Sequence, residues 1–183
     1  DVMVHNILDC IRKNDFYLAE EYINIGMQIK GSSECKLNKQ RLRALKRQIE
    51  QPLEYVKTKE SVDELLLQGD TAKYLKEYAA LENFYILHSL KEMSVQHKPI
   101  REIIYEFGSD ELAVSTIENL MKYRQYEQGV EALAALKDFG YKSRHTKKIQ
   151  KQLGKMMSLA ESKRNDKIAQ SNRMMDKYGE DKW

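Results

Sequence analysis

The sequence contains few of the residues that end helices and shape turns. Its 183 residues include 8 glycines and 2 prolines, about 5% of the chain against an average of roughly 12%. β-Sandwiches, β-barrels and doubly wound α/β folds need many more turn residues, so this composition excludes them. The abundant residues, chiefly Lys, Glu, Leu, Gln and Ala, favour helices. The composition therefore predicts an all-α protein of one or two domains.

Cysteine is also scarce, and a long apolar run is missing. The 2 cysteines, Cys10 and Cys35, cannot by themselves form a disulfide framework or a zinc site. In a helical hairpin their sulfur atoms would lie roughly 20 Å apart, and two free thiols favour a reducing compartment. No run of about 18 apolar residues can span a membrane, and no segment reads as a signal peptide. Because the chain starts at Asp1 rather than Met, we expect a fragment or a processed product. The earlier removal of a signal peptide or an anchor therefore stays open, and so does the localisation.

Positive charge is concentrated in the C-terminal part of the chain. The net charge is +3, but residues 141–183 hold 12 Lys and Arg against 5 Asp and Glu, whereas residues 1–140 hold 19 against 23. Such asymmetry occurs in tails that contact acidic partners, nucleic acid or anionic lipid. A solvated helix face produces it too, and that is our first interpretation.

Apolar residues recur at helical spacing along almost the whole chain and predict nine helices. Asp15, Pro52 and Ser109 suit helix starts, and Gly69 and Gly108 suit helix ends. The expected helices cover residues 2–13, 15–30, 34–50, 52–68, 70–93, 100–107, 109–123, 125–138 and 143–161.

Short connections between these helices predict antiparallel neighbours. A stacked array of antiparallel helical hairpins with a C-terminal capping helix fits this pattern best, and a closed bundle is the alternative. We assign residues 1–160 to this array as one helical-repeat domain. Beyond Glu161 the apolar periodicity fades, so residues 161–183 are expected to form a loosely held basic extension.

Residues 14–26 carry a more specific pattern. An Asn-Asp turn is followed by an aromatic, a small, a large apolar and a second small residue, at Phe16, Ala19, Ile23 and Gly26. This segment resembles the turn and second helix of a tetratricopeptide repeat (TPR). The small residues allow neighbouring helices to approach closely, and the aromatic covers the bend.

Other segments match the repeat less fully. The aromatic, small and large spacing recurs at Tyr126, Gly129 and Leu133, although Leu136 stands where a small residue is expected. Residues 68–70 (Gln-Gly-Asp) imitate the turn. The first helix departs from the pattern at Met3, Asn6, Ile7 and Cys10. The TPR resemblance implies a right-handed superhelix of hairpins that binds peptides or proteins and has no chemistry of its own.

Motifs for catalysis are missing as well. The sequence has no Gly-rich phosphate loop, no nucleophile elbow and no His-Glu-x-x-His. A metal site would need ligands from separate helices, because the histidines never lie three or four residues apart: His5, His88, His97 and His145. Paired acids such as Asp110-Glu111 have a simpler role as favourable charges at a helix N-terminus. We therefore predict no enzyme activity, no metal and no cofactor.

Two groups of residues are candidates for binding a partner. Tyr74, Tyr78 and Tyr85 share one face of the helix expected over 70–93. Core packing is the first interpretation of this stripe, and a half-exposed groove wall is the second. The other group lies in a basic stretch without acids between Glu34 and Glu50, and it can pair with acidic groups of a partner: Arg41, Arg43 and Lys46.

These features predict a non-catalytic module that holds a protein or peptide partner in a groove between hairpins. A nucleic-acid-binding regulator fragment is the alternative, with the C-terminal helix presenting Lys147, Lys148, Lys151 and Lys155. A helical accessory domain of an enzyme ranks third. We place a capping role for this helix above nucleic-acid binding, because the end helix of an array is apolar on one side and polar on the other. The apolar stripe behind the lysines consists of Ile149, Leu153, Met156, Met157 and Ala160.

Overall fold

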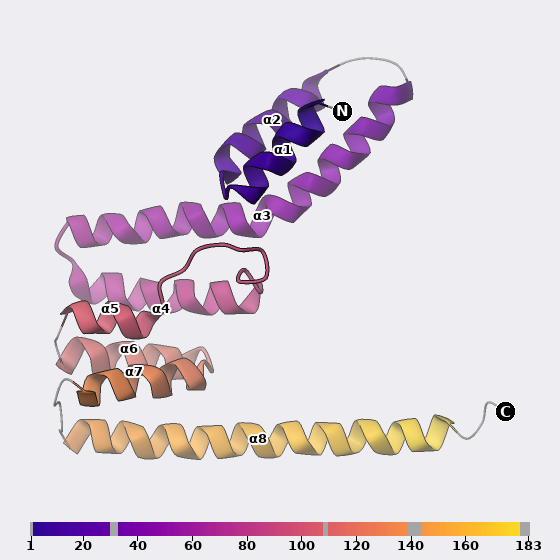
Figure 1. The fold of residues 1–183 in the computed structure, drawn as a ribbon. Coiled ribbons are helices and arrows are strands. Elements are labelled where there is room, and N and C mark those ends of the chain that lie inside the picture. The colour runs from indigo at the N-terminus through magenta and orange to yellow at the C-terminus, as the bar shows by residue number, and fades with distance from the viewer. Residues whose placement is uncertain (1, 30–32, 108–109, 139–143, 180–183) are drawn as a thin grey trace. The chain divides into compact units, whose positions relative to one another are not determined.

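A computed structural model describes residues 2–29, 33–107, 110–138 and 144–179. Within these ranges it contains eight helices and no strand, so the all-α prediction is confirmed (Figure 1). The helices are α1 (Val2–Arg12), α2 (Phe16–Gln28), α3 (Ser33–Leu67), α4 (Thr71–Leu87), α5 (Ile100–Phe107), α6 (Asp110–Lys122), α7 (Tyr126–Asp138) and α8 (Arg144–Gly179).

The helices form two compact units, Asp1–Pro99 and Ile100–Trp183. In the first unit, α2 packs against α1 and α3, and α3 packs against α4. In the second unit, α7 packs against α5, α6 and α8, and α8 also contacts α6. The division between the units falls inside the single domain that the sequence led us to expect over residues 1–160.

Helix α3 is continuous where the sequence predicts two helices. Pro52 lacks an N–H group and its ring crowds the carbonyl four residues earlier, which is why we expected a new helix to begin there. The helix instead runs through the proline and changes direction along its length (Figure 1). Ile49, Leu53 and Tyr55 are buried on either side of Pro52. Packing against α2 and α4 therefore keeps the two halves in one helix.

Helix α4 ends at Leu87, before the end at Met93 that the apolar periodicity predicts. Ser89 and Ser94 have positive φ angles of 51° and 60°, which a helix cannot accommodate. Leu90, which continues the apolar pattern, is buried by this non-helical turn. Periodicity alone does not distinguish a buried turn residue from a buried helical one, and the predicted end was therefore wrong.

Three of the inter-helix turns have the same backbone geometry. Their left-handed residues are Asn14 (φ 59°), Gly69 (φ 79°) and Arg124 (φ 61°). In each turn the next residue donates its N–H to the carbonyl five positions earlier, at 2.9, 3.0 and 2.9 Å. This is the Schellman arrangement, which satisfies the last carbonyl groups of the preceding helix. The carboxylates of Asp15 and Asp70 then accept N–H groups of the next helix, as the sequence analysis expected for Asp15.

The small residues of α2 lie where helices approach closely, as predicted. Ala19 is fully buried and Gly26 is buried. A Cβ atom added to Gly26 would lie 2.7 Å from Leu42 Cδ1 and 2.7 Å from Met3 Sδ, so α1 and α3 both meet α2 at this point. Phe16 and Ile23, the large residues of the same pattern, are buried too.

Replacing Ala19 by Leu is expected to lower the free energy of unfolding by about 1–3 kcal/mol, because Ala19 is fully buried and a larger side chain would have to displace its neighbours. Urea denaturation measures this difference. Ala44→Leu is the matched control, since Ala44 is exposed on α3 and its substitution adds volume only toward solvent. An Ala19→Leu protein that unfolds at the same urea concentration as the parent would contradict the close approach.

Helix α8 extends far beyond the end expected near Glu161, and it continues past the ends of α6 and α7 (Figure 1). Its buried stripe is shorter than predicted, because only Ile149 and Leu153 are buried whereas Met156 is 42% exposed. All side chains from 158 to 175 are exposed. The predicted outward direction of the lysines is confirmed, since all of these are exposed: Lys147, Lys148, Lys151 and Lys155.

Gly154 lies in the middle of α8, and a Cβ atom added there would meet no atom within 4 Å. Gly154→Ala is therefore expected to raise the free energy of unfolding by about 0.5–1 kcal/mol through helix propensity. Gly69→Ala is the matched control and should lower it by roughly 1 kcal/mol, because Gly69 has a positive φ angle. Thermal melting of both variants checks the pair, and equal melting temperatures would contradict the expectation.

Candidate functional site

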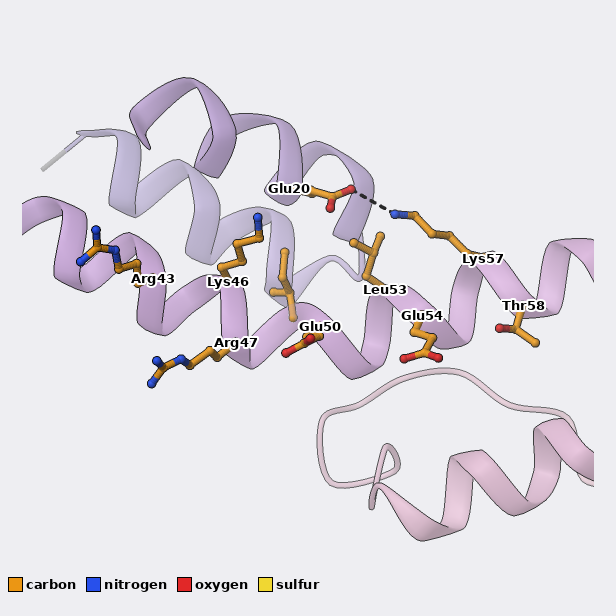
Figure 2. Close-up of a pocket in the computed structure, with 10 residues that line it drawn as sticks. Glu20, Arg43, Lys46, Arg47, Glu50, Leu53, Glu54, Lys57 and Thr58 are labelled. Carbon is orange, nitrogen blue, oxygen red and sulfur yellow. Dashed lines mark hydrogen bonds and ion pairs between the residues drawn. The ribbon is translucent and has the colours of Figure 1, made fainter. Parts of the chain in front are cut away.

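A hollow of about 540 Å³ lies along α3 beside α2 (Figure 2). We call it the α3 hollow. Its floor is apolar, because Ile49 and Leu53 are only 1% and 6% exposed. Its remaining lining is polar: Glu20 from α2, and Arg43, Lys46, Arg47, Glu50, Glu54, Lys57 and Thr58 from α3.

The α3 residues of this lining recur at spacings of three and four, so the helix places them along one face. The positive side chains of Arg43, Lys46 and Arg47 gather at one end of the hollow, and Glu50 and Glu54 follow along the helix (Figure 2). The positive residues of α3 therefore line one end of the hollow, and the negative residues lie next to them along the helix.

Three of the four cations that line the α3 hollow have no ion-pair partner within the described part of the chain. Among the described residues, none forms a hydrogen bond or ion pair with Arg43, Lys46 or Arg47, and the same holds for Glu50 and Glu54. Arginine presents a planar fork of donors that matches a carboxylate or phosphate, and lysine adds a point charge. This end of the hollow is therefore suited to an anionic group.

The other end of the α3 hollow is closed by an ion pair. Lys57 Nζ lies 3.2 Å from Glu20 Oε2 and joins α3 to α2 (Figure 2). Both side chains are partly solvated, at 50% and 31% exposure, so this pair contributes little to stability. It fixes the position of a wall of the hollow.

The structure places the predicted binding residues in two separate locations. Arg43 and Lys46 line the α3 hollow, whereas Arg41 is exposed on α3 outside it. Arg47 also lines the hollow, but it was not among the predicted binding residues. It belongs to the same basic stretch and lies four residues after Arg43. That spacing is the signal by which the sequence could have identified it.

The predicted tyrosines do not line the α3 hollow. Tyr74 and Tyr78 are 4% and 1% exposed, and Tyr85 is half-buried. The stripe thus packs as core, in line with the first of its two interpretations. The α3 hollow therefore does not combine these tyrosines with the basic residues of α3.

Two of these tyrosines, Tyr78 and Tyr85, instead stack on His97. The His97 ring lies between two tyrosine rings, with ring centroids 4.4 Å from Tyr85 and 5.6 Å from Tyr78 and interplanar angles of 21°. Its Nδ1 lies 2.6 Å from the hydroxyl of Tyr55, and its Nε2 lies 2.6 Å from Oε2 of Glu82. The side chains of His97 and Glu82 are only 4% and 6% exposed, so the pair is almost sealed from water.

Tyrosine hydroxyls also hold the chain around His97 in place. Tyr78 donates a hydrogen bond to the carbonyl of Lys98 at 2.6 Å, and Tyr85 donates one to the carbonyl of Val95 at 3.0 Å. Burial raises the pKa of Tyr78 well above its ordinary value, so its hydroxyl keeps its proton and remains a donor. The cluster therefore fastens the segment after α4 to α3 and α4.

Sequence reasoning missed this cluster because its members are not neighbours in the chain. Tyr55 and His97 are 42 residues apart, and no local spacing connects them. The buried His97 side chain joins Tyr55 of α3 to Glu82 of α4.

Within the described part of the chain, no group of three or more His, Cys, Asp or Glu residues is placed to hold a metal ion. None of the described helices combines the length and apolar character required to cross a bilayer. Comparison with models of protein families, with curated proteins and with solved structures finds no match to this chain. The fold and site therefore define an all-α protein with a charged, apolar-floored hollow on α3.

Proposed function

We propose that the protein is a non-catalytic module of TPR-like helical hairpins that holds a protein or peptide segment in the α3 hollow. The observation that carries this proposal is the set of cations without partners among the described residues, Arg43, Lys46 and Arg47, beside the apolar floor of Ile49 and Leu53. An unpaired positive cluster beside buried apolar side chains is typical of sites that take an anionic anchor together with an apolar one.

The repeat character of the proposal rests on shared local geometry. The turns at Asn14, Gly69 and Arg124 each contain one left-handed residue, and the residue after it donates the same backbone hydrogen bond. Small residues stand at close approaches in both units: Gly26 faces Leu42, and a Cβ atom on Gly129 would lie 3.1 Å from Leu153 Cδ2. Repetition of one hairpin plan is the feature by which helical-repeat proteins build binding surfaces.

The charges of the α3 hollow specify the segment that would fit it. An acidic side chain would pair with Arg43 and Arg47, and a neighbouring apolar side chain would cover Leu53. Basic side chains at the other end of the segment would face Glu50 and Glu54. The proposed ligand is therefore an extended or helical protein segment with an acidic end, an apolar centre and a basic end.

Capture of binding proteins from source cells tests this proposal when paired variants are compared. Arg43→Glu with Arg47→Glu reverses two cations of the α3 hollow, and the captured protein should be lost. Lys73→Glu with Lys76→Glu makes the same charge change on exposed positions of α4 and should leave capture intact. Equal capture by both double variants would contradict the assignment of the α3 hollow as the site.

The nucleic-acid alternative is favoured by one observation, the exposure of Lys147, Lys148, Lys151 and Lys155 on α8. Binding through phosphate contacts weakens steeply as salt rises, whereas binding of a segment with an apolar anchor changes less. Titration of labelled duplex and single-stranded DNA at low and physiological salt therefore separates the two functions. Tight binding at physiological salt that is lost on replacing these lysines would favour the alternative.

A further inference from the structure

A second hollow, of about 660 Å³, lies beside α8 in the second unit. We call it the α8 hollow. One wall is the start of α7 and the turn before it, with Arg124 and Tyr126. The other wall is the middle of α8, including Leu159, Lys163 and Lys167. Because α8 continues past α7, none of the described helices of the second unit covers this surface (Figure 1).

Large apolar side chains are exposed along this part of α8. Met156, Leu159 and Ile168 line the α8 hollow and are 42%, 60% and 49% exposed. Further along the helix, Met174 and Met175 are 58% and 71% exposed. Met156, Leu159 and Met174 recur at multiples of helical spacing, so they share one face. A shared exposed apolar face on one helix is a mark of an interaction surface.

The same hollow is strongly positive. Arg124, Lys163, Arg164 and Lys167 line it, and within the described ranges no ion pair or hydrogen bond engages any of the four side chains. A second copy of this chain docked symmetrically would bring these cations against one another, which opposes self-association through this face. The charge therefore selects an acidic occupant.

We propose that the α8 hollow binds an acidic amphipathic helix of another protein. From Met156 to Lys167 the face is about 17 Å long, which matches roughly three turns of a docked helix. The apolar side of that helix would cover Met156 and Leu159, and its acidic residues would reach Lys163 and Lys167. This surface is separate from the α3 hollow, so the proposal for it does not depend on the proposed function.

Two features of the α8 hollow favour a helix over other anionic ligands. Arg124 and Tyr126 form a second wall, which makes the surface concave and suits a rod rather than a flat bilayer. Leu159 and Ile168 lie among the cations, where a nucleic acid would place phosphates against apolar side chains. An amphipathic helix satisfies both the apolar and the positive groups.

The test uses the full chain and a synthetic helical peptide of about 20 residues, with leucines along one face and glutamates flanking them. Fluorescence anisotropy at about 0.15 M salt measures its affinity. Lys163→Glu with Lys167→Glu is expected to weaken binding at least about tenfold. Lys155→Glu with Arg173→Glu makes the same charge change on exposed α8 positions that do not line the hollow, and it should leave the affinity unchanged.

A second variant separates an amphipathic ligand from any polyanion. Leu159→Ser should weaken the leucine-containing peptide about fivefold or more and leave the binding of polyglutamate unchanged. The proposal is overturned if the peptide does not bind, if both charge-reversed double variants weaken it equally, or if polyglutamate binds as tightly. Tighter binding of an oligonucleotide or of vesicles containing phosphatidylserine through Lys163 and Lys167 would overturn it as well. Circular dichroism confirms that each variant remains folded.

Discussion

His97→Ala is expected to lower the free energy of unfolding by about 3–5 kcal/mol, because the histidine is one half of a buried charged or hydrogen-bonded pair. Its removal takes a partner from the carboxylate of Glu82 and from the hydroxyl of Tyr55, both in a nearly dry site. It also leaves a gap between the stacked rings of Tyr78 and Tyr85. Chemical denaturation monitored by tyrosine fluorescence and circular dichroism measures the loss.

His5→Ala is the matched control, because the His5 side chain is 70% exposed and its loss should change stability little. A double-mutant cycle adds a second check. Glu82→Gln alone should be destabilising, and the combination with His97→Ala should cost less than the sum of the two single changes, since both act on one contact. Fully additive effects, or an unaltered unfolding midpoint for His97→Ala, would rule out the pair as a source of stability.

Removing α8 is expected to have the second large effect. Ending the chain after Gly140 removes Ile149 and Leu153, each 1% exposed, and uncovers the apolar side chains of α7 and α6 that they contact in the second unit. Burial of two such side chains is worth roughly 3–6 kcal/mol. The melting temperature of the second unit, followed by calorimetry, should fall clearly.

Ending the chain after Glu161 is the matched truncation. It removes exposed side chains through position 175, so the melting temperature should remain nearly unchanged although helix content falls. The comparison separates the packed start of α8 from its exposed continuation. A large drop after removal of residues 162–183 alone would show that this extension contributes to the stability of the unit.

Part of the candidate site was accessible from the sequence. The basic stretch on α3 indicated Arg43 and Lys46, because six cations between two glutamates are visible without any structure. The apolar floor of the hollow was not accessible, since Ile49 and Leu53 look like ordinary core residues in the sequence. The hollow forms because α2 passes beside this part of α3 and leaves space there. This is a property of the packing and cannot be read from the sequence.

Helix α8 shows the same limit of prediction from sequence. The lysines at 147, 148, 151 and 155 were expected to face water because they lie off the apolar stripe, and they do. The stripe itself was expected to be buried through Ala160, yet Met156 is 42% exposed. Periodicity identifies which residues share a face, but the length of the neighbouring helix decides how much of that face is covered.

By itself the sequence determined the helical fold, the turn at residues 14–15 and the burial of Ala19 and Gly26. The fold class and the turn depend on composition and on caps between residues a few positions apart. The two small residues were identified by their spacing along α2, although Met3 and Leu42, which meet Gly26, are distant from it in the chain. The tertiary structure decided that α3 continues through Pro52 and that His97 is enclosed by tyrosines. Both outcomes depend on desolvation and packing between residues distant in the chain, and only the folded arrangement supplies those contacts.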